Sequence, residues 1–362
     1  MTAQWMGRKT ARRSRFVCMR CQPLRPGRLR TIRKRRAVSD MSFRFWLFSL
    51  GALAVVLPWF LVVSPAQAHG GVDSGQTVAS AWNRDPAVPL VILLAGALYA
   101  AGLRRWKNPS HPVNAWQRVS FFAGLGAIFL ALQSPLDPLS DHLFLAHQVQ
   151  HLLLRMVGPP LILLGAPLTP LLRGLPVAAR QQVVRPLAGN PALRRLYAFL
   201  THPMVAALLF LGTLFFWQGQ GPHNLSLRND IVHYLMHLSM LFSGILFWWV
   251  IIDPKPHRSR MPYVARALYL GFQIFPNTLL GAIVTFSPGV LYTAYGEVER
   301  LWGISLMADQ AIGGTILWIP GDMMFLIAAG IMVGLWLRQE EEKGRAGAAL
   351  PRPVSSPGPP GR

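Results

Sequence analysis

Long apolar segments alternate with short polar connections along most of the chain. Seven of these segments lie between residues 87 and 337: 87–103, 118–134, 143–166, 199–217, 231–252, 267–286 and 311–337. At about 1.5 Å of rise per residue, each is long enough as a helix to cross a bilayer, and the first two are the shortest. Because lipid cannot satisfy backbone polar groups, the pattern predicts an all-α fold, a polytopic membrane bundle of about seven transmembrane helices.

Positive charge is divided unevenly between the connections. One alternating set holds 18 lysines and arginines, in 104–118, 168–198, 253–266 and 338–362. The opposite set holds only Arg84, Arg228 and Arg300. Cytoplasmic loops are enriched in Lys and Arg, so we expect the first set to be cytoplasmic. The mature N-terminus is then outside and the C-terminus inside.

An additional apolar stretch, residues 41–68, precedes the seven segments and has the features of a signal segment. Arg44 gives it a short positive start, about twenty apolar residues follow, and it ends with the small-x-small sequence Ala66-Gln67-Ala68. We expect cleavage after Ala68, which makes His69 the mature N-terminus. Since a signal segment stands at the start of a chain, Met41 is the expected translation start.

Residues 1–40 are then a misassigned extension, or alternatively a disordered basic arm on anionic lipid. They contain 13 basic residues and one acid, Asp40, and so carry 12 of the 22 net positive charges. This distribution argues against a nucleic-acid partner and leaves the lipid bilayer as the expected environment. The two cysteines of the chain, Cys18 and Cys21, also lie here as a C-x-x-C pair, a weak metal or redox signal.

The rest of the chain divides into a transmembrane domain at 69–338 and a tail at 339–362. The tail begins with Glu340, Glu341 and Glu342 and then becomes rich in Pro, Gly and Ala, which predicts disorder. Within the domain, 168–198 is basic and amphipathic, which predicts a short helix on the cytoplasmic surface.

Histidines inside two spans are the most informative polar residues. His147 and His151 lie in the third span, and His233 and His237 lie in the fifth. A spacing of four places both imidazoles of a pair on one helical face, where they can bind one metal. Given the expected orientation, both pairs lie near the external surface, so we predict a shared metal site.

Two other interpretations of these histidines stay open. They can form hydrogen bonds to neighbouring helices and so stabilise the bundle. They can also bind one haem, although a spacing of about 6 Å along the helix excludes two haems stacked across the bilayer. Imidazole suits copper, zinc, iron or nickel, and the sequence does not rank these metals. His69, Met236, Met240 and Met307 are further candidate ligands.

Two charges are expected at similar membrane depth, Arg155 in the third span and Asp322 in the seventh. An isolated charge there is expensive, so we predict that they form a buried ion pair or share a polar cavity. Arg155 can instead extend its charged end toward the inner surface. Asp309 and Gln310, at the external end of the seventh span, can complete a metal site or face water.

The motifs resemble those of a known family. The sequence HQVQHLLLRMVGPPLILLGAPL is similar to the signature of the CtaG-type membrane proteins, assembly factors for caa-type cytochrome c oxidase. HLSMLFSGILFWW and MADQAIGGTILWIPGD look like the fifth- and seventh-span motifs of that family, and the resemblance covers about residues 69–338. The chain departs from the pattern at Met236, where an acid is expected, and at Arg155, which is atypical.

The resemblance implies a multi-pass protein of the bacterial plasma membrane that helps to mature the oxidase, at its copper centres, and that contacts oxidase subunits. With the residue pattern, it predicts copper bound at the external face by His147, His151, His233 and His237, with Asp309 as an accessory ligand. The alternatives are a membrane transporter of copper or a small ligand and a b-type haem electron-transfer protein. No nucleophile–base arrangement or phosphate loop is apparent, so we expect no enzymatic activity.

Overall fold

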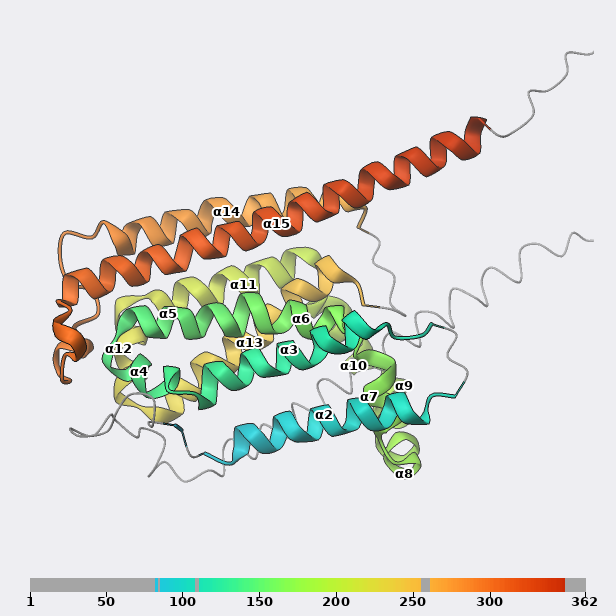
Figure 1. The fold of residues 1–362 in the computed structure, drawn as a ribbon, viewed down its shortest axis with the longest axis horizontal. Coiled ribbons are helices and arrows are strands. Elements are labelled where there is room, and N and C mark those ends of the chain that lie inside the picture. Colours follow the sequence, from blue (N-terminus) through green and yellow to red (C-terminus); the bar gives the residue numbers. More distant parts are fainter. Residues whose placement is uncertain (1–81, 84, 108–110, 255–260, 349–362) are drawn as a thin grey trace, which may run out of the picture.

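The computed structural model describes residues 82–83, 85–107, 111–254 and 261–348, and the regular elements of these residues are helices (Figure 1). Five helices are long and apolar enough to cross a membrane singly, and two bent pairs raise the number to as many as seven. The five are α2 Ala87–Arg105, α3 Ala115–Gln133, α13 Asp230–Ile252, α14 Tyr263–Thr285 and α15 Leu306–Ala348. The predicted all-α membrane bundle is confirmed. The signal segment 41–68, the extension 1–40 and His69 lie outside the described residues.

The first bent pair contains the third predicted span. It consists of α5 Phe144–Leu152, the π-helical turn η3 Leu153–Val157 and α6 Gly158–Leu164, followed by α7 Leu168–Gly174 at 76°. The sharp bend occurs where Ala166 adopts a left-handed conformation (φ 48°) before Pro167. Proline restricts the residue before it and cannot donate a hydrogen bond, so the helix ends there.

The π turn binds the third span to the fifth. Pro159 has no N–H, so the carbonyl of Arg155 lacks its usual helical donor and instead accepts the indole N–H of Trp248 at 3.0 Å. At this level α13 presents Gly244, where a Cβ would lie 3.0 Å from the Arg155 carbonyl oxygen. The absence of a side chain thus lets the two spans approach closely.

Residues 168–198 form a series of short helices, so the prediction of one amphipathic helix is wrong. The series contains α7, α8 Val177–Ala179, η4 Arg180–Val184, α9 Arg185–Gly189 and α10 Pro191–Leu200, which is bent by 67° from α11 Pro203–Gln218. Prolines within the segment prevent a continuous helix. α7 crosses α2 through Gly102 and Gly174, where an added Cβ would lie 1.7 Å from the Pro170 oxygen and 2.0 Å from the Leu98 oxygen, respectively.

The hairpin of α14 and α15 forms one side of the bundle, and α15 continues beyond its neighbours (Figure 1). Its helical conformation persists to Ala348. The prediction that disorder begins at residue 339 is therefore wrong for the first ten residues of the tail, while 349–362 lie outside the described residues.

The two ends of the bundle differ in polarity. The end that carries α8 to α10, here the α8 end, contains an apolar core around Phe210, Trp248 and Phe325. The opposite end, here the α12 end, is formed by α4 Leu136–His142, α12 Gln220–Arg228 and the connection 286–305 with η5 Thr293–Gly296 and η6 Leu301–Gly303. Buried polar side chains gather at the α12 end.

Candidate metal centre

The four predicted histidines come together between α5 and α13. All four side chains are buried. The ring centroids are 4.3 Å apart for His147 and His151 and 4.4 Å apart for His233 and His237. Across the two helices, the ring centroids are 5.1 Å apart for His147 and His233 and 5.6 Å apart for His151 and His237. The two four-residue spacings therefore place their imidazoles on helix faces that meet.

Three of these histidines are close enough to share an ion. One ring nitrogen from each of His147, His151 and His237 lies within 4.8 Å of the other two. Metal–nitrogen bonds of about 2.0–2.1 Å require donor atoms to be somewhat closer than this limit, which small side-chain rotations can achieve. His233 contacts the group through its Nε2 atom, 3.2 Å from Nε2 of His237.

The nitrogens that face this space are largely without protein partners. Nε2 of His147 and both ring nitrogens of His151 are buried and accept or donate no hydrogen bond within the described residues. A buried polar atom that is not paired destabilises the fold by roughly 1–3 kcal/mol. A metal ion would relieve that penalty, so this donor set fits a metal.

A fifth histidine, His223, belongs to the same cluster and was not predicted. It is fully buried in α12, and its ring centroid lies 5.0 Å from that of His147. Burial lowers the pKa of His223 to about 4, so its imidazole is neutral near pH 7. The sequence offers no signal for it, because it is a single histidine in a connection with no partner four residues away.

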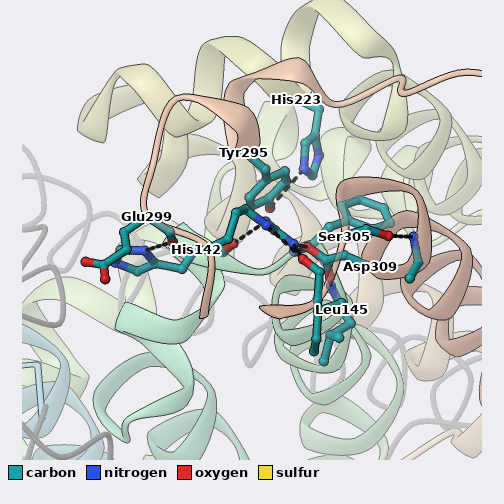
Figure 2. Close-up of polar contacts among 11 residues, drawn as sticks. His142, Leu145, His223, Tyr295, Glu299, Ser305 and Asp309 are labelled. Carbon is teal, nitrogen blue, oxygen red and sulfur yellow. Dashed lines mark hydrogen bonds and ion pairs between the residues drawn. The ribbon is translucent and has the colours of Figure 1, made fainter. Parts of the chain in front are cut away.

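Tyr295 of η5 lies between His147 and His223, and Figure 2 shows its hydroxyl beside His223. Its hydroxyl oxygen is 2.8 Å from Nδ1 of His147 and 3.3 Å from Nε2 of His223. Burial raises the pKa of Tyr295 well above its ordinary value, so the side chain remains a phenol. Sequence reasoning also missed this residue.

Asp309 does not join the histidines. Its carboxylate accepts the backbone N–H groups of Phe144 at 3.0 Å and Leu145 at 2.9 Å and forms an ion pair of 2.9 Å with Arg300 (Figure 2). It caps the N-terminus of α5, so its bonds do not support the predicted ligand role. Gln310 likewise binds backbone groups, those of Val284, Gly289 and Leu291.

Two of the three candidate sulfur ligands are buried, and the third is exposed. Met236 and Met240 are fully buried and pack against Trp217, whereas Met307 is 40% exposed.

Arg155 and Asp322 do not form the predicted ion pair. Arg155 donates to the carbonyl of Phe210 at 2.5 Å and lies over the ring of that residue. Asp322 accepts hydrogen bonds from Asn277 at 2.8 Å and Thr278 at 2.5 Å. The two charges face different neighbouring helices, α11 and α14.

A small cavity lies below the histidines, toward the α8 end. The space open to the centre of a water molecule is about 20 Å³, and the polar residues of its walls are Gln148, His151, Arg155 and Asn277. This volume accommodates one or two water molecules. Arg155 and the partner of Asp322, Asn277, therefore line one cavity although the charges are not paired.

Residues 97–339 match the family model described as cytochrome c oxidase caa3 assembly factor. The chain belongs to this family. The matched range includes each residue of the cluster described above, and the resemblance of the sequence motifs is confirmed. No solved structure matches the chain significantly.

This member of the caa3 assembly factor family has relatives in mycobacteria. The chain is 28% identical over 263 residues to an uncharacterized protein of Mycobacterium leprae. The matched region covers 72% of this chain and 40% of that protein. It is 30% identical over 273 residues to uncharacterized proteins of Mycobacterium bovis and Mycobacterium tuberculosis, with 73% of this chain and 40% of each of those proteins covered. The chain thus spans less than half the length of these relatives.

Proposed function

We propose that this protein assists the assembly of caa3-type cytochrome c oxidase by binding copper as a cargo between α5 and α13 and passing it to an oxidase subunit. The observation that carries the proposal is the buried group of His147, His151 and His237, whose ring nitrogens lie within 4.8 Å of one another. Membership of the family supports a role in assembling the oxidase, and the histidines support the binding of a metal.

Monovalent copper suits this donor set better than a divalent ion does. Each of the three ligands is neutral when it binds metal, and no carboxylate joins them in the described residues. The cost of burying an ion rises with its charge, so a monovalent ion is the least expensive in such a site. Imidazole is also a suitable ligand for copper.

A transporter is less well supported by the packing. A transport path needs polar groups through the whole membrane. Between the cavity of about 20 Å³ and the α8 end, however, the bundle is filled by the apolar core around Phe210, Trp248 and Phe325. A haem protein is also less well supported. Imidazole rings only 4.3–5.7 Å apart, beside a cavity of water size, leave no slot for a porphyrin.

The location of the centre agrees with a delivery role. The histidines lie near the α12 end, and we propose from the distribution of Lys and Arg that this end is at the external face of the bacterial plasma membrane. Copper released there would meet the oxidase from the same side of the membrane.

The test is the copper(I) content and affinity of the detergent-purified full chain, measured by competition with a chelator. We expect about one bound ion that is lost when His147, His151 and His237 are changed together to Ala. The matched control is His202→Ala, because His202 stands at the N-cap position of α11 at the α8 end, where its side chain forms no capping hydrogen bond, and lies outside the cluster. If neither wild type nor control binds copper, the histidines are structural and the protein acts as a scaffold. The same variants, returned to a strain lacking the gene, test whether copper binding is required for oxidase activity.

A further inference from the structure

Four groups from four segments form a continuous line of hydrogen bonds that ends at the metal centre. Nδ1 of His223 is 3.1 Å from the carbonyl oxygen of Trp217, and Nε2 of His223 is 3.3 Å from the hydroxyl of Tyr295. That hydroxyl is 2.8 Å from Nδ1 of His147. His147, His223 and Tyr295 are at most 1% exposed, so water does not compete for these bonds.

The chemistry of the groups sets the direction of each bond. A carbonyl only accepts, so Nδ1 of His223 carries the proton that is donated to Trp217. A neutral imidazole has one N–H, which leaves Nε2 of His223 as an acceptor for the Tyr295 hydroxyl. The single hydroxyl proton is then used, and the hydroxyl oxygen must accept from Nδ1 of His147. In this arrangement, Nε2 of His147 carries a lone pair.

We propose that Tyr295 and His223 are positioning residues of the metal centre, which hold His147 in the tautomer that offers its Nε2 lone pair to the ion. The inference rests on the metal-binding function proposed above. Nε2 of His147 is the nitrogen without a protein partner, which is the expected state of a ligand atom. In metal sites, the second ring nitrogen of a ligand histidine commonly donates to a fixed acceptor, and loss of that acceptor weakens metal binding by about 10–100-fold.

The connection that carries Tyr295 is itself held in place. The side chain of Asn224 in α12 accepts the backbone N–H of Ala294 at 3.1 Å. This bond holds η5 against α12, so the tautomer of His147 depends on two connections at the α12 end as well as on the spans. The hydroxyl of Tyr292 donates to the carbonyl of Gln218 at 3.0 Å and takes no part in the line.

Tyr292 provides a matched control for Tyr295. Both tyrosines lie in one connection, both are at most 2% exposed, and each loses one buried hydroxyl when changed to Phe. Only Tyr295 contacts a histidine of the proposed ligand group through its hydroxyl. We expect Tyr295→Phe to weaken copper(I) binding by about 10–100-fold and Tyr292→Phe to leave the affinity unchanged. Equal weakening by both variants would overturn the proposal.

A second pair of variants tests the other bond and guards against a folding defect in Tyr295→Phe. His223→Gln keeps an acceptor for the Tyr295 hydroxyl and a donor for Trp217, whereas His223→Leu keeps neither. The affinity should be near that of the wild type for His223→Gln and reduced for His223→Leu. Equal affinities in these two variants contradict a role in positioning.

The tautomer itself is measured without metal, which separates this inference from the proposed function. In the metal-free wild type, ¹⁵N spectra of labelled histidine should show His147 protonated at Nδ1, with assignment by His147→Ala. Tyr295→Phe should shift the population toward the Nε2–H form, and Tyr292→Phe should not. Absence of copper binding with this spectral result would refute the metal function alone. A wild type protonated at Nε2 would refute the hydrogen-bond line.

Discussion

The carboxylate of Asp309 accepts the backbone N–H of Leu145 at 2.9 Å and thereby caps the first turn of α5. Leu145 belongs to the third predicted span, and Asp309 stands at the external end of the seventh. The cap fixes the start of the helix that carries His147 and His151, and Arg300 holds the second carboxylate oxygen. The last helix thus orients two of the three proposed ligands, and its Asp309 is not itself among them.

We predict that Asp309→Ala lowers the free energy of unfolding and weakens copper binding together. Loss of an N-terminal cap costs about 0.5–2 kcal/mol, and Arg300 also loses its carboxylate partner Asp309. Asp309→Asn, which keeps one acceptor, should have a smaller effect. Denaturant titration in detergent measures the change. Glu297→Gln is the control, because its ion pair with Arg228 is exposed and should contribute nothing measurable. An Asp309→Ala variant as stable as the wild type would show that the cap is unimportant.

Arg155 and Arg266, which are both buried, should respond differently to replacement by Met. Arg155→Met removes a charge that has no carboxylate partner within the described part of the chain, and the Phe210 carbonyl keeps a hydrogen bond from Thr213 at 3.2 Å. We expect stability equal to or above that of the wild type, since a buried ion replaced by an apolar side chain is often neutral or stabilising.

Arg266→Met should be destabilising, because Arg266 pairs with Asp253 at 3.3 Å and donates to the carbonyl of Ile251 at 2.8 Å. Its replacement removes one bond from each of these two groups. The melting temperatures of the two variants, measured side by side in one detergent, test the contrast. A larger loss in Arg155→Met than in Arg266→Met would mean that Arg155 is stabilised by contacts beyond those described.

Two glycines give a prediction about the packing at the α8 end. Gly102→Ala should destabilise the protein strongly, because its Cβ would lie 1.7 Å from the backbone oxygen of Pro170 and α7 would have to move. Gly126→Ala in α3 has nothing within 4 Å of its Cβ and should be neutral or stabilising by about 0.5–1 kcal/mol. Thermal unfolding and the expression level of each variant, both compared with the wild type, test this contrast in stability.

The stability of the protein should fall between about pH 6.5 and pH 4, in part because of His223. Its folded pKa of about 4 lies below the ordinary value of 6.5, so in this window the unfolded chain binds a proton that the folded chain does not. The stabilisation is fully present above pH 6.5 and is lost as the pH decreases toward 4. His223→Gln should therefore reduce the difference in melting temperature between pH 7 and pH 5. An unchanged difference would show that His223 does not contribute.

The helices were predictable because their signal is local. A run of apolar residues is sufficient to identify a span, and the bends are also local, since Pro167 and Pro203 stand at the breaks. The exception is 168–198, where the amphipathic pattern indicates a helix but the prolines divide it. The tail after residue 338 was expected to be disordered from its composition, yet its first ten residues continue α15.

The histidine pairs were predictable for the same reason, because a spacing of four defines a face within one helix. The facing of different helices is not encoded in such spacing. Arg155 turns to Phe210 and Asp322 turns to Asn277, although depth alone suggested a pair. His223 and Tyr295 reach the centre only through the folding of two connections, so no local pattern identifies them.

The length of α15 has a practical consequence. Its 43 residues correspond to roughly 65 Å of helix, about twice the hydrocarbon thickness of a bilayer. A reporter dye attached near Glu341 would therefore be held away from the lipid on a rigid arm, at a set distance from the histidines. The cysteines of the chain are confined to Cys18 and Cys21, so after their replacement a single introduced thiol on this arm, labelled from one side of the membrane only, would determine which way the bundle is inserted.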